Sequence, residues 1–149
     1  MARLSKKVWF KKLKNEYIFV YGTLRKATAK SMGYLLDQHC DYFSEGHVQG
    51  KLYEINGYPG AVESNDKAEK IFGEIYIINQ SEIILPKLDE YEECTESFPQ
   101  PHEYTRKILP VTLSGGESVM AWVYIYNFAT SNLERINSGD YSFYLRKKL

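Results

Sequence analysis

The feature that most constrains the fold is a series of short segments rich in β-branched and aromatic residues, separated by turns that contain glycine or proline. Such segments predict β-strands, because their side chains pack well on a pleated sheet. The sequence predicts five of them, over Tyr17–Tyr21, His47–Ile55, Ile71–Ile78, Tyr104–Leu113 and Val119–Asn127. A short helix is predicted over Lys30–Gln38. Since 149 residues suit one core, the pattern predicts an α+β domain whose sheet curls toward a small β-barrel with a pocket at its mouth.

A second helix has the expected period over Gln80–Glu93. Four residues fall on or near one of its faces, namely Ile83, Ile84, Leu88 and Tyr91. Asn79 or Ser81 is its candidate N-cap. Pro86 interrupts the pattern, so the alternative is a helix that begins at Leu85 with Pro86 in its first position, where the missing N–H costs little.

The turns indicate how the strands connect. The cluster Asn56-Gly57-Tyr58-Pro59-Gly60 separates the second and third predicted strands, which we therefore expect to be antiparallel neighbours. Ser114-Gly115-Gly116 predicts a hairpin between the last two strands. The acidic, proline-bearing stretch from Cys94 to Glu103 predicts an irregular loop.

The composition excludes several classes of protein. Basic and acidic residues both number 19, so the general argument for a nucleic-acid partner is missing and none is expected. The absence of a run of about 18 apolar residues argues against a membrane span, and no secretion signal is evident. Cys40 and Cys94, with three scattered histidines, have no metal-ligand spacing. We expect a cytoplasmic protein with two free thiols, without metal or cofactor, and the sequence leaves its oligomeric state open.

The first 14 residues differ from the rest. They carry six basic side chains and no acidic one, so residues 1–14 have a charge of +6 and the remaining 135 residues a charge of −6. We interpret residues 1–14 as a basic N-terminal extension and residues 15–149 as the domain. A solvated terminus is the ordinary interpretation of such a segment, and a weak amphipathic arm that contacts a membrane surface or RNA is the alternative.

Four short motifs occur in an informative order. They are Tyr21-Gly-Thr-Leu-Arg25 after the first strand, Leu88-Asp-Glu-Tyr-Glu92 at the end of the helix, Tyr104-Thr-Arg106, and Ser138-Gly-Asp-Tyr141. Each is weak alone. Together they resemble the gamma-glutamylcyclotransferase-like family, of the AIG2-like or gamma-glutamylamine cyclotransferase type, and the resemblance extends from about Tyr17 to Asp140.

The resemblance implies a small mixed β-barrel with a few short helices, and an enzyme that releases 5-oxoproline from a small γ-glutamyl compound. It implies that Glu92 is the general acid/base. It also implies that the γ-glutamyl group is bound by four residues of the first motif, namely Tyr21, Gly22, Thr23 and Leu24. The chain departs from the family pattern at Glu93, where glycine is usual, and at Tyr141, where tryptophan is frequent. The interval from Glu92 to Tyr104 is also long, which leaves the identity of the leaving amine open among γ-glutamyl amino acids, γ-glutamyl-lysine, glutathione and biosynthetic intermediates.

The release of 5-oxoproline can also be explained from the residues themselves, without reference to the family. In a γ-glutamyl amide the α-amine can attack the γ-carbonyl of the same molecule, so the enzyme needs to fold the substrate and move protons rather than supply a nucleophile. A carboxyl group can do both proton transfers if burial raises its pKa, with Tyr91 and Tyr104 as candidate pocket walls. Gly22 would permit positive φ and turn backbone N–H groups toward a carboxylate or oxyanion. Arg25 is a further candidate pocket residue, although a long side chain beyond a loop is more often solvated.

Three alternatives stay open. Glu92 belongs to an acidic run that could be a solvated helix end, and Glu93 is the obvious misassignment. Arg106 is expected to form a structural ion pair with Asp89 or Glu74. The alternative function is a non-catalytic small-molecule-binding barrel of the same fold, and an outward-facing Glu92 would contradict catalysis.

Overall fold

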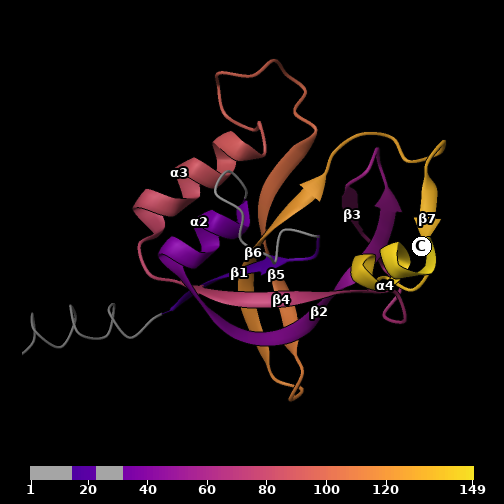
Figure 1. The fold of residues 1–149 in the computed structure, drawn as a ribbon, viewed down its shortest axis with the longest axis horizontal. Helices are drawn as coiled ribbons and strands as arrows, with labels where there is room; N and C mark the ends of the chain where they lie inside the picture. Colours follow the sequence, from indigo (N-terminus) through magenta and orange to yellow (C-terminus); the bar gives the residue numbers. More distant parts are fainter. Residues whose placement is uncertain (1–14, 23–31) are drawn as a thin grey trace, which may run out of the picture.

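The computed structural model describes residues 15–22 and 32–149 (Figure 1). The described elements are β1 (Glu16–Val20), α2 (Met32–His39), β2 (Cys40–Glu54), β3 (Pro59–Glu63), β4 (Lys70–Ile78), α3 (Ser81–Tyr91), β5 (Tyr104–Leu113), β6 (Ser118–Tyr126), β7 (Glu134–Ile136) and α4 (Tyr141–Lys147). The predicted basic extension 1–14 and the predicted site residues Thr23, Leu24 and Arg25 lie outside the described residues.

Five strands form a closed barrel. Their order is β2-β4-β1-β6-β5, and β5 pairs again with β2 through Gly46 and Leu113. The pairing of β1 with β6 is parallel, whereas the other pairings are antiparallel. The implied small mixed barrel and the predicted antiparallel arrangement of the second and third strands are therefore confirmed.

The barrel closes where two glycines face each other. Gly46 in β2 is paired with Gly73 in β4. A Cβ at Gly46 would lie 2.4 Å from the carbonyl oxygen of Thr112, and a Cβ at Gly73 would lie 2.2 Å from that of Val20. The strands approach too closely at this point for any side chain, which is a recognised use of glycine inside a sheet.

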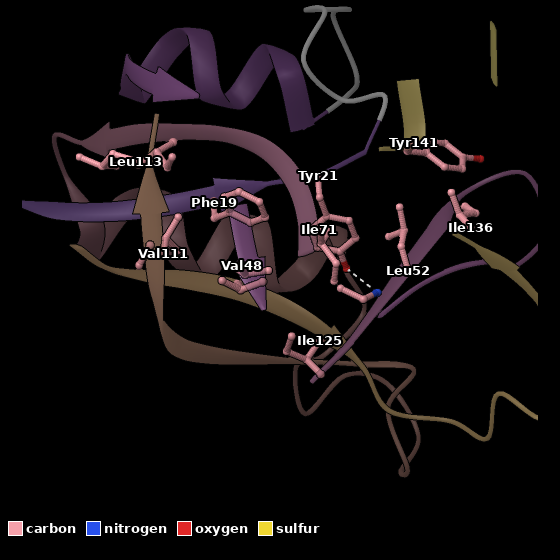
Figure 2. Close-up of a cluster of buried hydrophobic side chains, with 14 residues drawn as sticks. Phe19, Tyr21, Val48, Leu52, Ile71, Val111, Leu113, Ile125, Ile136 and Tyr141 are labelled. Atoms are coloured by element: carbon pink, nitrogen blue, oxygen red, sulfur yellow. Dashed lines mark hydrogen bonds between the residues drawn. The ribbon is translucent and has the colours of Figure 1, made fainter. Parts of the chain in front are cut away.

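The strands alternate between two apolar clusters. On β1, Phe19 belongs to the cluster inside the barrel, whereas Ile18 and Val20 belong to a second cluster beneath the helices. Figure 2 shows the first cluster, to which side chains from several strands and Tyr141 of α4 contribute. In the second cluster, Leu36 of α2 and Leu88 of α3 cover the outer face of the barrel, and Figure 1 shows these two helices side by side. No helix in the described part of the chain is long and apolar enough to cross a membrane.

Short elements account for most differences from the sequence predictions. β2 begins at Cys40, well before the predicted start, and its second half pairs with β3 and β7, which the sequence analysis missed. β3 starts at Pro59 and pairs only with β2, and an edge position of this kind is where a strand tolerates proline. The missed helix α4 begins after Asp140, whose side chain accepts a hydrogen bond from the backbone N–H of Phe143.

The details of α3 also differ. Its N-cap is Gln80, which makes no side-chain capping bond, so the predicted caps Asn79 and Ser81 are wrong. The side chain of Asn79 instead donates to Asp41, 3.0 Å away. Pro86 lies inside the helix rather than at its first position.

The buried face of α3 is rotated relative to the prediction. It consists of Ile84, Leu85 and Leu88, whereas Ile83 and Tyr91 are 38% and 40% exposed. An apolar period therefore located the helix but misplaced two of its four predicted face residues.

Candidate active site

A cavity of about 460 Å³ lies where the end of β1, the end of α3 and the start of β5 meet. This volume suits a small metabolite. Its described lining residues are mainly aromatic and acidic: Phe19, Val20, Tyr21, Gly22, Tyr58, Pro59, Tyr91, Glu92, Glu93, Glu103, Tyr104 and Tyr124. The structure thus brings together Tyr21, Gly22, Tyr91, Glu92 and Tyr104, all of which the sequence analysis had selected.

Glu92 is the residue that ends α3. Its backbone N–H donates to the carbonyl of Leu88 at 2.9 Å, and Leu88 is fully buried beneath the helix. The packing of α3 therefore fixes the position of the Glu92 backbone. The Glu92 side chain lines the cavity and is partly buried. Its pKa is raised from 4.5 to about 7, mainly by burial and to a smaller extent by the negative charges of Glu103 and Glu93. A charged carboxylate is costly in such surroundings.

The geometry of the helix end separates Glu92 from Glu93. The N–H of Glu93 donates to the carbonyl of Glu90 and the N–H of Cys94 to that of Asp89, which together form a Schellman motif. Glu93 occupies the left-handed position of this motif with φ = 57°. It lines the cavity as an exposed residue, whereas Glu92 lies deeper. The position where the family usually has glycine is thus a position that favours glycine.

Tyr21 and Gly22 form the inner wall. The buried Tyr21 hydroxyl donates to the carbonyl of Tyr124 at 2.5 Å and accepts from the N–H of Ala61 at 3.3 Å, which Figure 2 shows as a dashed line. Gly22 does not adopt the positive φ that a glycine would permit. A Cβ at Gly22 would lie 3.2 Å from Cγ of Pro59, so a larger residue would fit only if Pro59 moved by a small amount.

Two further tyrosines of the cavity donate to oxygen acceptors. Tyr104 donates to the carbonyl of Pro59 at 2.6 Å, and Tyr58 donates to Oε2 of Glu103 at 2.5 Å. Burial is the main cause that raises the pKa of Tyr104, with Tyr21, Glu92 and Glu103 adding to it. Tyr104 therefore stays a neutral hydroxyl at physiological pH.

An ion pair anchors α3 to the barrel. Arg106 binds both carboxylate oxygens of Asp89, at 2.8 and 3.1 Å, and its guanidinium lies 4.1 Å from the ring centroid of Trp122. The hydroxyl of Tyr124 donates to the same carboxylate at 2.7 Å. This confirms the predicted ion pair of Arg106 with Asp89, which lies three residues before Glu92. Glu74, the other predicted partner of Arg106, accepts a hydrogen bond from the hydroxyl of Tyr76.

Sequence reasoning missed Tyr58, Glu103 and Tyr124 as cavity residues. Tyr58 lies in a segment that was interpreted as a turn and given no role in the pocket, and Glu103 directly precedes a motif without belonging to it. The fourth motif, which contains Gly139, lines no part of this cavity. Gly139 has φ = 70°, and a Cβ there would lie 1.8 Å from the carbonyl oxygen of Lys70, so the motif serves to pack the chain before α4 against β4.

The fold and cavity define a small mixed-barrel protein with a partly buried carboxyl group in a ligand-sized, aromatic site. The chain belongs to the gamma-glutamyl cyclotransferase, AIG2-like family, whose model matches residues 18–143. The resemblance found in the sequence is therefore confirmed.

Two relatives and one solved structure illustrate the match. The provisionally named gamma-glutamylcyclotransferase MJ1514 of Methanocaldococcus jannaschii is 34% identical over 131 residues, which cover 87% of this chain and 98% of that protein. The gamma-glutamylcyclotransferase family protein YtfP of Escherichia coli K12 is 32% identical over 124 residues, covering 83% and 94%. The crystal structure of an AIG2-like protein from Mus musculus has a TM-score of 0.64 at 26% identity, covering 85% of this chain and 88% of the mouse chain.

Proposed function

We propose that this protein is a cyclotransferase that releases 5-oxoproline from a γ-glutamyl amide, with Glu92 as the general acid/base. The observation that carries the proposal is the position of Glu92 on the cavity wall beside Tyr21 and Gly22, with a pKa of about 7. An acid/base works best when its pKa is near the operating pH. Family membership supports the same reaction class.

The proposed reaction needs one bond formed and one broken. Glu92 takes a proton from the substrate's α-ammonium, and the resulting amine attacks the γ-carbonyl carbon to close a five-membered lactam. Glu92 gives this proton to the leaving nitrogen as the bond from that carbon to the leaving nitrogen breaks. The ring nitrogen, which carries a positive charge after the attack, loses its extra proton through Glu92 to the released amine, so that the products are the neutral lactam and an ammonium ion. Because nucleophile and electrophile belong to one molecule, the binding of a folded substrate supplies much of the rate acceleration.

The neighbouring hydroxyls support a positioning role rather than acid/base chemistry. Burial, and secondarily the charge of Glu92, raises the pKa of Tyr21 far above neutrality. The same applies to Tyr104. Both hydroxyls already donate to backbone carbonyls, so they shape the wall against which the γ-glutamyl group folds.

The test is 5-oxoproline release from a panel of γ-glutamyl amides by the wild type and by Glu92→Gln. The glutamine side chain keeps the size of Glu92 but cannot exchange the proton, so we expect kcat/KM to fall by roughly a hundredfold or more. The matched control is Glu90→Gln, since Glu90 is an exposed acid on the same helix that does not line the cavity. We expect this variant to match the wild type.

The outcome separates the two functions considered for this chain. Equal turnover by Glu92→Gln and the wild type would contradict the role of Glu92. Binding of panel members without release of 5-oxoproline would contradict the cyclotransferase and support the non-catalytic binding barrel. Circular dichroism of both variants establishes that a loss of turnover is not a loss of fold.

A further inference from the structure

A second cavity, of about 150 Å³, lies between β2, the start of β4 and the turn that follows β7. Its described lining shares no residue with that of the candidate active site. Ser138 and Gly139 of the fourth sequence motif belong to this lining, and the proposed function gives them no role. Gly139 holds the turn against β4, since its N–H donates to the carbonyl of Ile136 and its own carbonyl accepts from the N–H of Phe72.

Positive charge exceeds negative charge on this lining. Arg135 and Lys70 are its described basic residues, and Glu69 is its described acidic residue. Both oxygens of Glu69 have partners, because Oε1 accepts from the hydroxyl of Ser64 at 2.6 Å and Oε2 accepts from Nη2 of Arg135 at 2.8 Å. The hydrogen bond from Ser64 is the largest cause that lowers the pKa of Glu69, and Arg135 lowers it as well. Arg135 therefore offsets the charge of Glu69, whereas Lys70 has no ion-pair partner in the described part of the chain.

Two other acidic residues precede or follow the lining residues in the sequence, and each accepts a hydrogen bond in its own turn. Oδ1 of Asp66 accepts from the backbone N–H of Ala68 at 2.9 Å. Oδ1 of Asp140 accepts from the backbone N–H of Phe143 at 3.2 Å, which caps α4. Neither aspartate lines the cavity, so the balance of charge on its lining stays positive.

Arg135 has a buried N–H group that lacks an acceptor. Its Nε has no hydrogen-bond partner among the described residues, although its Nη2 binds Glu69. Nη1 of Arg106 is also buried without such a partner, but that guanidinium lies over the ring of Trp122, and ring faces attract cations. No ring in the described part of the chain lies over Arg135 in this way. A buried charged donor without an acceptor is costly, so Arg135 favours an acceptor from outside the chain.

We infer that this cavity binds a small oxyanion of the size and shape of phosphate, with Arg135 and Lys70 as its cationic ligands. Asn137 and Ser138 add an amide and a hydroxyl that can donate to the same ion. An arginine fork beside a lysine ammonium is a combination that proteins use to bind phosphate. A volume of about 150 Å³ admits such an ion but lies below the roughly 300 Å³ at which pockets hold whole drug-sized ligands. The ligand is therefore free inorganic phosphate, or the phosphate group of a monoester whose remainder extends into solvent.

The test is a titration of the 149-residue chain with sodium phosphate, followed by two-dimensional NMR of the backbone amides. Sodium chloride keeps the ionic strength constant. We expect saturable shifts of the amide signals of Lys70, Asn137 and Ser138, and none at Glu92. The expected Kd is about 1 mM, which a few charge-assisted hydrogen bonds at an open site can supply. A parallel titration with glycerol 3-phosphate distinguishes the two sources, because tighter binding of the monoester indicates a metabolite and tighter binding of inorganic phosphate indicates the free ion.

Variants then assign the binding to residues. Lys70→Gln removes a cationic ligand without breaking an ion pair, and the Kd for phosphate should rise by about tenfold, typical of a lost charge-assisted hydrogen bond. Arg135→Gln should weaken binding as well, but it also takes a partner from Glu69, so circular dichroism must show that this variant folds. Lys87→Gln is the matched control, because Lys87 is an exposed lysine of α3 that lines neither cavity. Its Kd should equal that of the wild type.

Three results would overturn the inference, and none of them bears on the proposed function. The first is the absence of saturable shifts at Lys70, Asn137 and Ser138 with either phosphate compound, which would mean that water fills the cavity. The second is a set of shifts confined to residues 1–14, which would mean that their positive charge attracts the anion without a specific site. The third is the same Kd in Lys70→Gln and Lys87→Gln, which would mean that the ammonium group of the cavity takes no part in binding.

Discussion

At the scale of single residues, Glu92 combines a chemical use with a cost in stability. Its folded pKa of about 7 lies above the ordinary value of 4.5. Between these values the folded state binds more protons than the unfolded state, so the contribution of Glu92 to stability is fully present below pH 4.5 and is lost as pH rises through 7. When Glu92 is ionised, and can therefore act as a base, it lowers the stability of the folded state.

We therefore predict that Glu92→Gln is more stable than the wild type at pH 8, by about 3 kcal/mol, and equally stable at pH 4. Glutamine carries no charge at either pH, so it avoids the cost of burying the ionised group. Urea unfolding at pH 4, 6 and 8 measures the difference, with Glu90→Gln as the control that should track the wild type. A difference between Glu92→Gln and the wild type that does not change with pH would contradict the elevated pKa.

At the scale of elements, the end of α3 decides which acid enters the site. The Schellman motif stops the helix at Glu92, and the left-handed residue Glu93 turns the chain into the loop that leads to β5. In Figure 1 this loop connects α3 to β5. The ion pair between Asp89 and Arg106 fixes the same turn of α3 to the barrel wall from the other side. Helix packing, helix termination and the ion pair together determine the position of Glu92.

We predict that Glu93→Gly stabilises the protein by about 1 kcal/mol, because glycine adopts φ = 57° without the strain of a Cβ. Glu93→Ala is the matched control, since it removes the same charge but keeps the Cβ. Thermal and urea unfolding of the two variants isolate the backbone contribution. Stability of Glu93→Gly no higher than that of Glu93→Ala would contradict a strained backbone at this position.

At the scale of the whole molecule, patterns of neighbouring residues predicted the long strands and most of the site, because these features depend on residues that are adjacent in the sequence. The segment Tyr104–Leu113 has its predicted bounds, and Glu92 and the Asp89–Arg106 pair follow from short motifs. β3 and β7 could not be predicted in this way, because they exist only as partners of the overlong β2. The cavity residues Tyr58 and Glu103 were also missed, because they are hydrogen-bonded to each other although 45 positions separate them in the sequence.

The closure of the barrel also depends on residues that are far apart in the sequence, and a substitution at Gly46 tests it. Gly46→Ala would place a Cβ 2.4 Å from the Thr112 carbonyl oxygen and 2.6 Å from Cδ1 of Ile75, so that β2 and β5 must separate and the Ile75 side chain must also move. We expect a loss of about 3 kcal/mol in the free energy of unfolding, typical of overpacking against atoms that cannot yield. Gly115→Ala is the control, because its Cβ would meet only the flexible end of Glu117 in a hairpin turn, and urea unfolding compares the two. Equal stability of the two variants would contradict the close approach of β2 and β5 at Gly46.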